Sequence, residues 1–213
     1  MLPIRSRILD KDWKNPIKKK IIEKMFQDQR AIILGEELKK DLHNLIPDKD
    51  IFILPNAIKN EVNDNKFRNI LKGRKKSKQF SILFLSNMNK TKGWPKLLEA
   101  CKILKNKNID FKCNFVGAWP SNKEKNNFFI YIRNNDLEKQ VNYLGKRTGE
   151  EKNDILVSSS VLVFPTEYKL ETFGRVIIEA MMFALPVIAN GVATIPTIIQ
   201  HKKTGFVLRK NTS

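Results

Sequence analysis

Long uninterrupted apolar runs are missing from this sequence of 213 residues. A helix that crosses a bilayer needs roughly 20 consecutive apolar residues, and no stretch approaches that length. The longest candidate, residues 176–199, is broken by Glu179, Pro186, Asn190 and Pro196. The opening stretch "MLPIRSRILDKDWKNP" also lacks the apolar core of a secretory signal. These absences favour a cytoplasmic protein without a membrane span.

Cysteine is also scarce, because the chain holds only Cys101 and Cys113, and they form no Cys-x-x-Cys pair. Two separated cysteines provide neither a disulfide framework nor the clustered ligands of a metal site. We therefore interpret both as reduced thiols in the core of a cytosolic protein. We expect no metal and no cofactor.

Acidic residues are few beside basic ones, with 22 Asp and Glu against 40 Lys and Arg and a net charge of +18. Such a balance favours anionic partners such as acidic lipid headgroups, phosphorylated substrates or nucleic acid. An AT-rich coding sequence also enriches Lys, Asn and Ile, so composition leaves both explanations open. The basic stretch "KGRKKSK" has no interleaved aromatic residues for stacking on bases, which argues against nucleic acid.

Short apolar segments alternate with amphipathic ones along most of the chain, and this rhythm predicts a parallel sheet. Strands are expected at residues 31–35, 50–58, 80–86, 111–117, 141–145, 161–165, 186–190 and 204–208. Helices are expected within residues 1–30 and at 36–46, 93–106, 150–159, 175–184 and 195–200, while 126–135 reads as helix or strand. The fold class is therefore α/β, a Rossmann-like parallel sheet with helices on both faces.

The polar, basic segment 59–79 interrupts this rhythm, and we interpret it as a linker. It separates residues 1–58 from a second unit, residues 80–213. A solvated surface helix is the alternative for the same segment.

Two glutamates, Glu171 and Glu179, lie eight positions apart in the mostly apolar segment "ETFGRVIIEAMMFALPVIANG". A helix is predicted to begin near Phe173 or Gly174, directly after a strand and its loop. The N–H groups of Thr172, Phe173 and Gly174 would then form a cradle for a diphosphate, although the Gly-x-Gly-x-x-Gly spacing is absent.

The helical rise places the two carboxylates on the order of 10–12 Å apart along the axis. This separation suits the ribose and the hexose of a nucleotide-sugar, since a carboxylate accepts hydrogen bonds from sugar hydroxyls. Spacing alone favours the plainer interpretation, in which Glu171 caps the helix and Glu179 is an ordinary residue on the face of that helix.

Further candidates follow other predicted strands, because ligands of such sheets bind beyond the carboxyl ends of the strands. Lys92 lies in "SNMNKTKG", where its ammonium could neutralise a diphosphate. Asn87 and Gly93 share that loop, and Gly145 and Lys146 follow the strand at 141–145.

The segments "ETFGRVIIEAM", "LPVIAN" and "TGFVL" together resemble the Glu-x7-Glu region of retaining glycosyltransferases of family 4 (group 1). "FLSNMNKTKGWPKLLEA" is similar to the strand, loop and helix that carry the phosphate-binding lysine of this family. "GEELKKDL" and "IFILPNAI" resemble the end of its N-terminal domain.

This resemblance implies the two-domain GT-B fold, of which residues 1–58 supply the tail of the N-terminal acceptor-side domain. Residues 80–213 supply a donor-binding domain that is incomplete at its C-terminus. Glu171 would contact the donor hexose and act with Lys92 in catalysis. Glu179 would bind the ribose hydroxyls, and the amides of Phe173 and Gly174 would help Lys92 to bind the diphosphate.

The implied reaction transfers a hexose from a nucleotide-sugar to a glycan or lipid-linked acceptor with retention, in polysaccharide or cell-envelope biosynthesis. Asn87 replaces an arginine that the family often has, so it offers a hydrogen bond but no fixed cation. The positive charge would suit docking at the anionic inner face of a membrane. Whether this chain alone turns over its donor stays open.

Two other functions remain open on the residues alone. The first is a non-catalytic α/β domain that binds nucleotide or nucleic acid. The second is a sugar-nucleotide epimerase of similar architecture.

Overall fold

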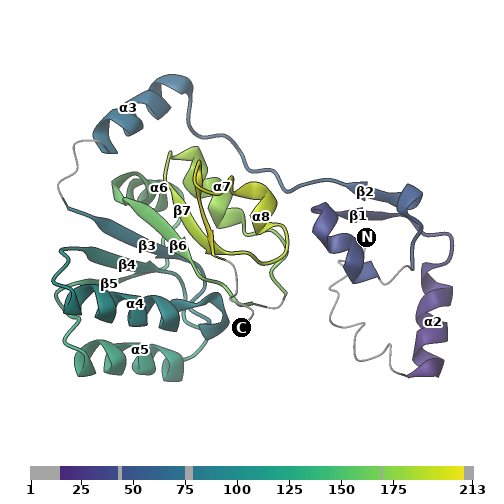
Figure 1. The fold of residues 1–213 in the computed structure, drawn as a ribbon, viewed down its shortest axis with the longest axis horizontal. Coiled ribbons are helices and arrows are strands. Elements are labelled where there is room, and N and C mark those ends of the chain that lie inside the picture. Colours follow the sequence, from purple (N-terminus) through teal and green to yellow (C-terminus); the bar gives the residue numbers. More distant parts are fainter. Residues whose placement is uncertain (1–14, 43–44, 75–78, 169, 209–213) are drawn as a thin grey trace.

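A computed structural model describes residues 15–42, 45–74, 79–168 and 170–208 (Figure 1). The parts of the predictions that fall on residues 1–14, 43–44, 75–78 and 209–213 lie outside these ranges. Among the described residues, no helix is long and apolar enough to cross a bilayer.

The N-terminal part is a small unit with two parallel strands, β1 (Ala31–Ile33) and β2 (Ile51–Ile53). Helix α2 (Pro16–Phe26) precedes it, and the side chain of Asn15 caps that helix by accepting from two backbone N–H groups. The segment expected as a helix at 36–46 is instead a 3₁₀ helix, η1 (Glu36–Leu42), and a second one, η2 (Asp48–Asp50), leads into β2. Leu38 and Leu42 of η1 pack under the two strands.

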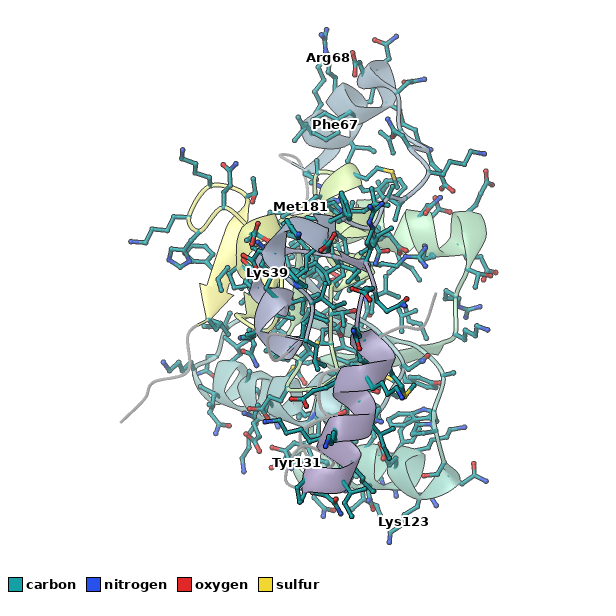
Figure 2. The ribbon with its side chains drawn as sticks, turned by 90° about the vertical axis from the view of Figure 1, so that its right-hand side faces the viewer. Lys39, Phe67, Arg68, Lys123, Tyr131 and Met181 are labelled. Atoms are coloured by element: carbon teal, nitrogen blue, oxygen red, sulfur yellow. The ribbon has the colours of Figure 1, made fainter. Side chains whose placement is uncertain are left out.

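Helix α3 (Asp64–Arg74) lies within the segment expected to be a linker. This helix is attached to the second unit, because Val62 and Ile70 are buried in the same core cluster as residues of the large sheet. Figure 2 shows Phe67 and Arg68 projecting from α3 at one end of the molecule, opposite Lys123 of α5 (Asn122–Asn134). The sequence alternative of a helix in this segment is therefore correct for residues 64–74, although one face of the helix is not solvated.

The large sheet has six parallel strands in the order β5-β4-β3-β6-β7-β8. Their bounds are β3 (Ser81–Leu85), β4 (Lys112–Val116), β5 (Val141–Gly145), β6 (Val161–Phe164), β7 (Val187–Asn190) and β8 (Gly205–Leu208). The chain enters at the centre with β3, adds strands outward to β5, returns to the centre with β6, and adds strands in the other direction. This parallel α/β sheet agrees with the fold class that the sequence predicts.

Helices cover both faces of the sheet, and the strand period of two decides which side chains meet them (Figure 1). Along β3, Ile82 and Phe84 face one core cluster, whereas Leu83 and Leu85 face the other. The first cluster includes side chains of α4 (Trp94–Asn106) and α5. The second includes side chains of α6 (Gly149–Ser158), α7 (Arg175–Met182) and α8 (Ile195–Ile198).

Three finer expectations are settled by these elements. The ambiguous segment 126–135 is helical, as part of α5. Helix α7 begins at Arg175, as in the expected range 175–184 and one residue after the start predicted near Phe173 or Gly174, because Gly174 takes a left-handed conformation with φ of 70° and caps the helix. Cys101 and Cys113 are free and buried, and burial raises the pKa of the Cys113 thiol well above its ordinary value.

Candidate functional site

The order of the strands creates a switch point between β3 and β6, where successive connections leave the sheet in opposite directions. Ligands of open α/β sheets bind in the crevice at such a point, beyond the carboxyl ends of the strands. The loop after β3 contains η3 (Lys90–Lys92), and the loop after β6 runs to Gly174. The two loops lie against each other, since the backbone N–H of Glu167 donates to the carbonyl of Thr91 at 2.8 Å.

Two glycines permit the close approach of backbone segments at this edge. Gly93 has φ of 92°, and a Cβ built on it would lie 2.1 Å from the carbonyl oxygen of Pro165. A Cβ on Gly117 would lie 1.7 Å from the carbonyl oxygen of Ser86. Any other residue at either position would push the strand-end loops apart, so both glycines fix the shape of the crevice.

Lys92 and Glu171 form the central ion pair of the site. The ammonium Nζ of Lys92 lies 2.7 Å from Oε2 of Glu171, and the two side chains are 18% and 12% exposed. The other carboxylate oxygen, Oε1, accepts from the backbone N–H of Gly174 at 3.1 Å. The ring of Tyr168 lies below the ammonium, 4.2 Å from Nζ to the centroid. A carboxylate therefore occupies the position at the helix tip where the sequence predicts an anion.

Glu179 forms a second, separate ion pair from the middle of α7. Its Oε2 lies 2.8 Å from Nζ of Lys152 on α6, and the side chains of Lys152 and Glu179 are 26% and 19% exposed. The two glutamates of the Glu-x7-Glu segment thus each face a lysine from another element.

The structure brings together some of the predicted site residues and separates others. Lys92, Gly93, Glu171 and Gly174 belong to the two facing loops. Of the remaining candidates, Asn87 and Lys146 are exposed, whereas Phe173 is buried. The backbone carbonyls of the other two are already bonded within the protein: that of Thr172 accepts from the hydroxyl of Thr194, and that of Gly145 accepts from the N–H of Gly117. Gly145 lies on β5, two strands from β3, so it belongs to a different part of the carboxyl edge.

Sequence reasoning missed Lys152 and Tyr168. Lys152 is one of many lysines, and only its place on the helix before β6 distinguishes it. Tyr168 lies in the loop between β6 and α7, which the sequence already indicated as part of the site, so this aromatic residue could have been proposed from its position alone. Within the ranges that the structure describes, no group of three or more His, Cys, Asp or Glu side chains could hold a metal ion.

Curated proteins of similar sequence include sugar-transferring enzymes. The N-acetyl-alpha-D-glucosaminyl L-malate synthase of Bacillus anthracis is 30% identical over 186 residues, which cover 85% of this chain and 46% of that protein. The D-rhamnosyltransferase WbpZ of Pseudomonas aeruginosa is 30% identical over 129 residues, 60% of this chain and 31% of that protein. The chain thus spans about half the length of these relatives or less.

Solved structures share the fold at lower identity. A glycosyltransferase from Rickettsia africae matches with a TM-score of 0.71 and 21% identity, over 92% of this chain and 53% of that one. The Anabaena protein Alr3699/HepE, solved in complex with UDP, matches with a TM-score of 0.69 and 17% identity, over 85% of this chain and 50% of that one.

The sequence also matches a family model directly. The model of the family described as "Glycosyl transferases group 1" covers residues 65–213, which include both loops of the crevice and both glutamates. With this match over most of its length, the chain belongs to the group 1 glycosyltransferases, a family with the GT-B fold.

Proposed function

We propose that this chain carries the donor-binding part of a retaining glycosyltransferase that transfers a hexose from a nucleotide-sugar to a glycan or lipid-linked acceptor. The observation that carries the proposal is the ion pair of Lys92 and Glu171 at the tip of α7, in the switch-point crevice. The Anabaena protein of the same fold has been solved in complex with UDP-glucose, which supports a nucleotide-sugar as donor.

In the proposed bound state, the diphosphate takes the place of Glu171 beside Lys92 and the N–H of Gly174. Glu171 then turns its carboxylate to the hydroxyls of the hexose, while Glu179 accepts from the ribose hydroxyls. The bond between the anomeric carbon and the diphosphate breaks, the acceptor oxygen bonds to the same face of that carbon, and the hydroxyl proton passes to the leaving diphosphate.

The positive groups at the helix tip contribute most where negative charge develops. Lys92 and the N–H of Gly174 are fixed in place before the reaction, so they stabilise the leaving diphosphate without reorganisation. The proposal assigns this role to the protein alone, with no metal ion or cofactor. Acceptor groups are assigned to the other half of a two-domain enzyme, since the chain spans about half of its relatives.

Replacement of Glu179 tests the proposal on this chain. Saturable binding of a nucleotide-sugar such as UDP-glucose is expected by calorimetry, and Glu179→Ala should weaken it by roughly 10–100-fold, because a hydrogen bond to a charged group contributes about 1.5–3 kcal/mol. A circular dichroism melt checks that the variant folds. The matched control is Glu99→Ala on α4, which removes the same charge outside the crevice.

The rival function gives the opposite pattern in the same preparation. A basic binding module would bind oligonucleotides tightly with a steep dependence on salt, and would not bind nucleotide-sugars. Such a result, with Glu179→Ala equal to the unchanged chain, would reject the donor site.

We further propose a cytoplasmic enzyme that contacts an anionic membrane surface peripherally through α2. Ile17 and Met25 of this helix are 72% and 62% exposed, and lysines flank them. A basic helix with an exposed apolar face binds anionic interfaces. Co-sedimentation with vesicles of phosphatidylglycerol is expected and should be lost in Ile17→Asp/Met25→Asp. Equal co-sedimentation of that variant, or equal binding to neutral vesicles, would contradict this assignment.

A further inference from the structure

We propose that Lys152 is a positioning residue of the donor site, which orients the carboxylate of Glu179 toward the ribose hydroxyls of the bound nucleotide. The inference rests on the proposed function, because it takes Glu179 as the residue that binds ribose. It adds a residue on a different helix, and it predicts how the protein discriminates ribose from deoxyribose.

The contact that carries this inference joins two helices on one face of the sheet. Lys152 is the fourth residue of α6, and Glu179 is the fifth residue of α7. Each helix follows a strand of the parallel sheet, so both begin near the carboxyl edge where ligands bind. Side chains of both helices share one core cluster, and Nζ of Lys152 lies 2.8 Å from Oε2 of Glu179.

The ends of the same two helices are tied together independently. The guanidinium of Arg74 donates to the carbonyls of Leu156 and Ser159, at the end of α6, and to the carbonyl of Phe183, at the end of α7. Since the helices are fixed at their C-terminal ends, the Lys152–Glu179 pair is held in a frame that does not depend on the ligand.

The pair leaves one carboxylate oxygen for a ligand. Oε2 of Glu179 is held by Lys152, and within the described ranges no protein donor contacts Oε1. The last torsion of a free glutamate is broad, so an unheld carboxylate would have to be ordered when the nucleotide binds. An ammonium that fixes this torsion beforehand lowers that cost, which is the usual effect of preorganisation.

Lys152 has a second effect, which acts on the diphosphate. An unpaired carboxylate would repel the anionic diphosphate, and the ammonium of Lys152 offsets that repulsion. When Lys152 is removed, the loss of this offset lowers the affinity for every nucleoside diphosphate alike. The orientation of Glu179, in contrast, matters only for nucleotides that carry the 2′-hydroxyl. The ratio of two affinities therefore isolates the positioning role.

The experiment compares UDP with 2′-deoxy-UDP, and GDP with 2′-deoxy-GDP, by calorimetry on the 213-residue chain. The unchanged chain should prefer the ribonucleotide of at least one pair by about 10–100-fold, as expected for one hydrogen bond to a charged group. Lys152→Met should reduce that preference by about tenfold, and Lys152→Arg should retain most of it, since arginine keeps the charge and the donors.

Two further variants separate positioning from a stabilising role. In Glu179→Gln the ribose preference should be low already, and adding Lys152→Met should not lower it further, because the two residues act through one contact. The matched control is Lys105→Met on α4, a lysine that is 30% exposed and bonds the carbonyls of Asn135 and Asp136. It should leave the preference unchanged.

The possible failures differ from each other. If Glu179→Gln lowers the ribose preference and Lys152→Met does not, the positioning role is wrong while the donor site stands. If no nucleotide of either pair binds the unchanged chain, or if Glu179→Gln leaves the preference intact, the proposed function fails and this inference fails with it. If the Lys152→Met chain is unfolded by circular dichroism, Lys152→Gln decides instead, because it also removes the ammonium: it should lower the ribose preference by about tenfold, and an unchanged preference would reject the positioning role.

Discussion

Lys92→Met is expected to weaken the binding of a nucleoside diphosphate by about 10–100-fold, the effect of losing one strong charge-assisted hydrogen bond. The ammonium already stands beside an anion in the free protein, since Oε2 of Glu171 lies 2.7 Å from it. A diphosphate at the tip of α7 would meet the same ammonium together with the N–H of Gly174. Titration of UDP by calorimetry measures the change.

The control for this variant lies on the same 3₁₀ helix. Lys90→Met removes an equal charge two residues away, where the side chain is exposed. It should change the affinity by less than about twofold, because exposed charges are screened by solvent and salt. Equal losses in the two variants would mean that the net charge of +18 attracts the anion without a defined site, and the donor site would have to be abandoned.

Arg74→Ala is expected to lower the free energy of unfolding by about 3 kcal/mol, because it leaves the carbonyls at two helix ends without their donor. The last carbonyls of a helix have no partner within it, and a cation near them is favourable. Arg74 serves two helices at once, with bonds of 2.6 Å to Leu156, 2.9 Å to Phe183 and a further one to Ser159. Urea unfolding followed by circular dichroism measures the loss.

The charge and the planar donors of the Arg74 guanidinium lead to two further expected results. Burial lowers the pKa of the Arg74 guanidinium, yet arginine stays charged in proteins, so the interaction persists across the accessible pH range. Arg74→Lys should recover part of the stability, because one ammonium cannot reproduce the planar fork of donors. Arg68→Ala, on the outward side of the same helix, should change stability by less than about 0.5 kcal/mol (Figure 2). A similar loss in both variants would contradict the role given to Arg74.

The local pattern of the chain predicted its elements well. Near-continuous apolar runs separated by amphipathic segments indicated the strands and helices of the large sheet, because each strand is buried on two faces. One exception is the segment 36–42, which forms a 3₁₀ helix although its leucines recur at helical spacing.

The functional segments were also visible in the sequence. Lys92 and the N–H of Gly174 were predicted to meet a diphosphate at one helix tip, with Glu171 beside them for the hexose, and the structure brings all three into one hydrogen-bonded network. Their roles toward a donor stay predictions until binding is measured. The packing of the segment 59–79 was harder to predict, because only two of its described residues, Val62 and Ile70, are buried in the core of the large sheet.

Local sequence was enough to specify the elements, the family and the side chains that stand at the strand ends, because these depend on neighbours within one turn or one strand. The strand order β5-β4-β3-β6-β7-β8 emerges from tertiary packing, and with it the pairing of Lys152 with Glu179 and of Arg74 with two helix ends. These contacts join residues that are far apart in the chain. They arise from how whole helices pack against one sheet, which no local period of apolar residues encodes.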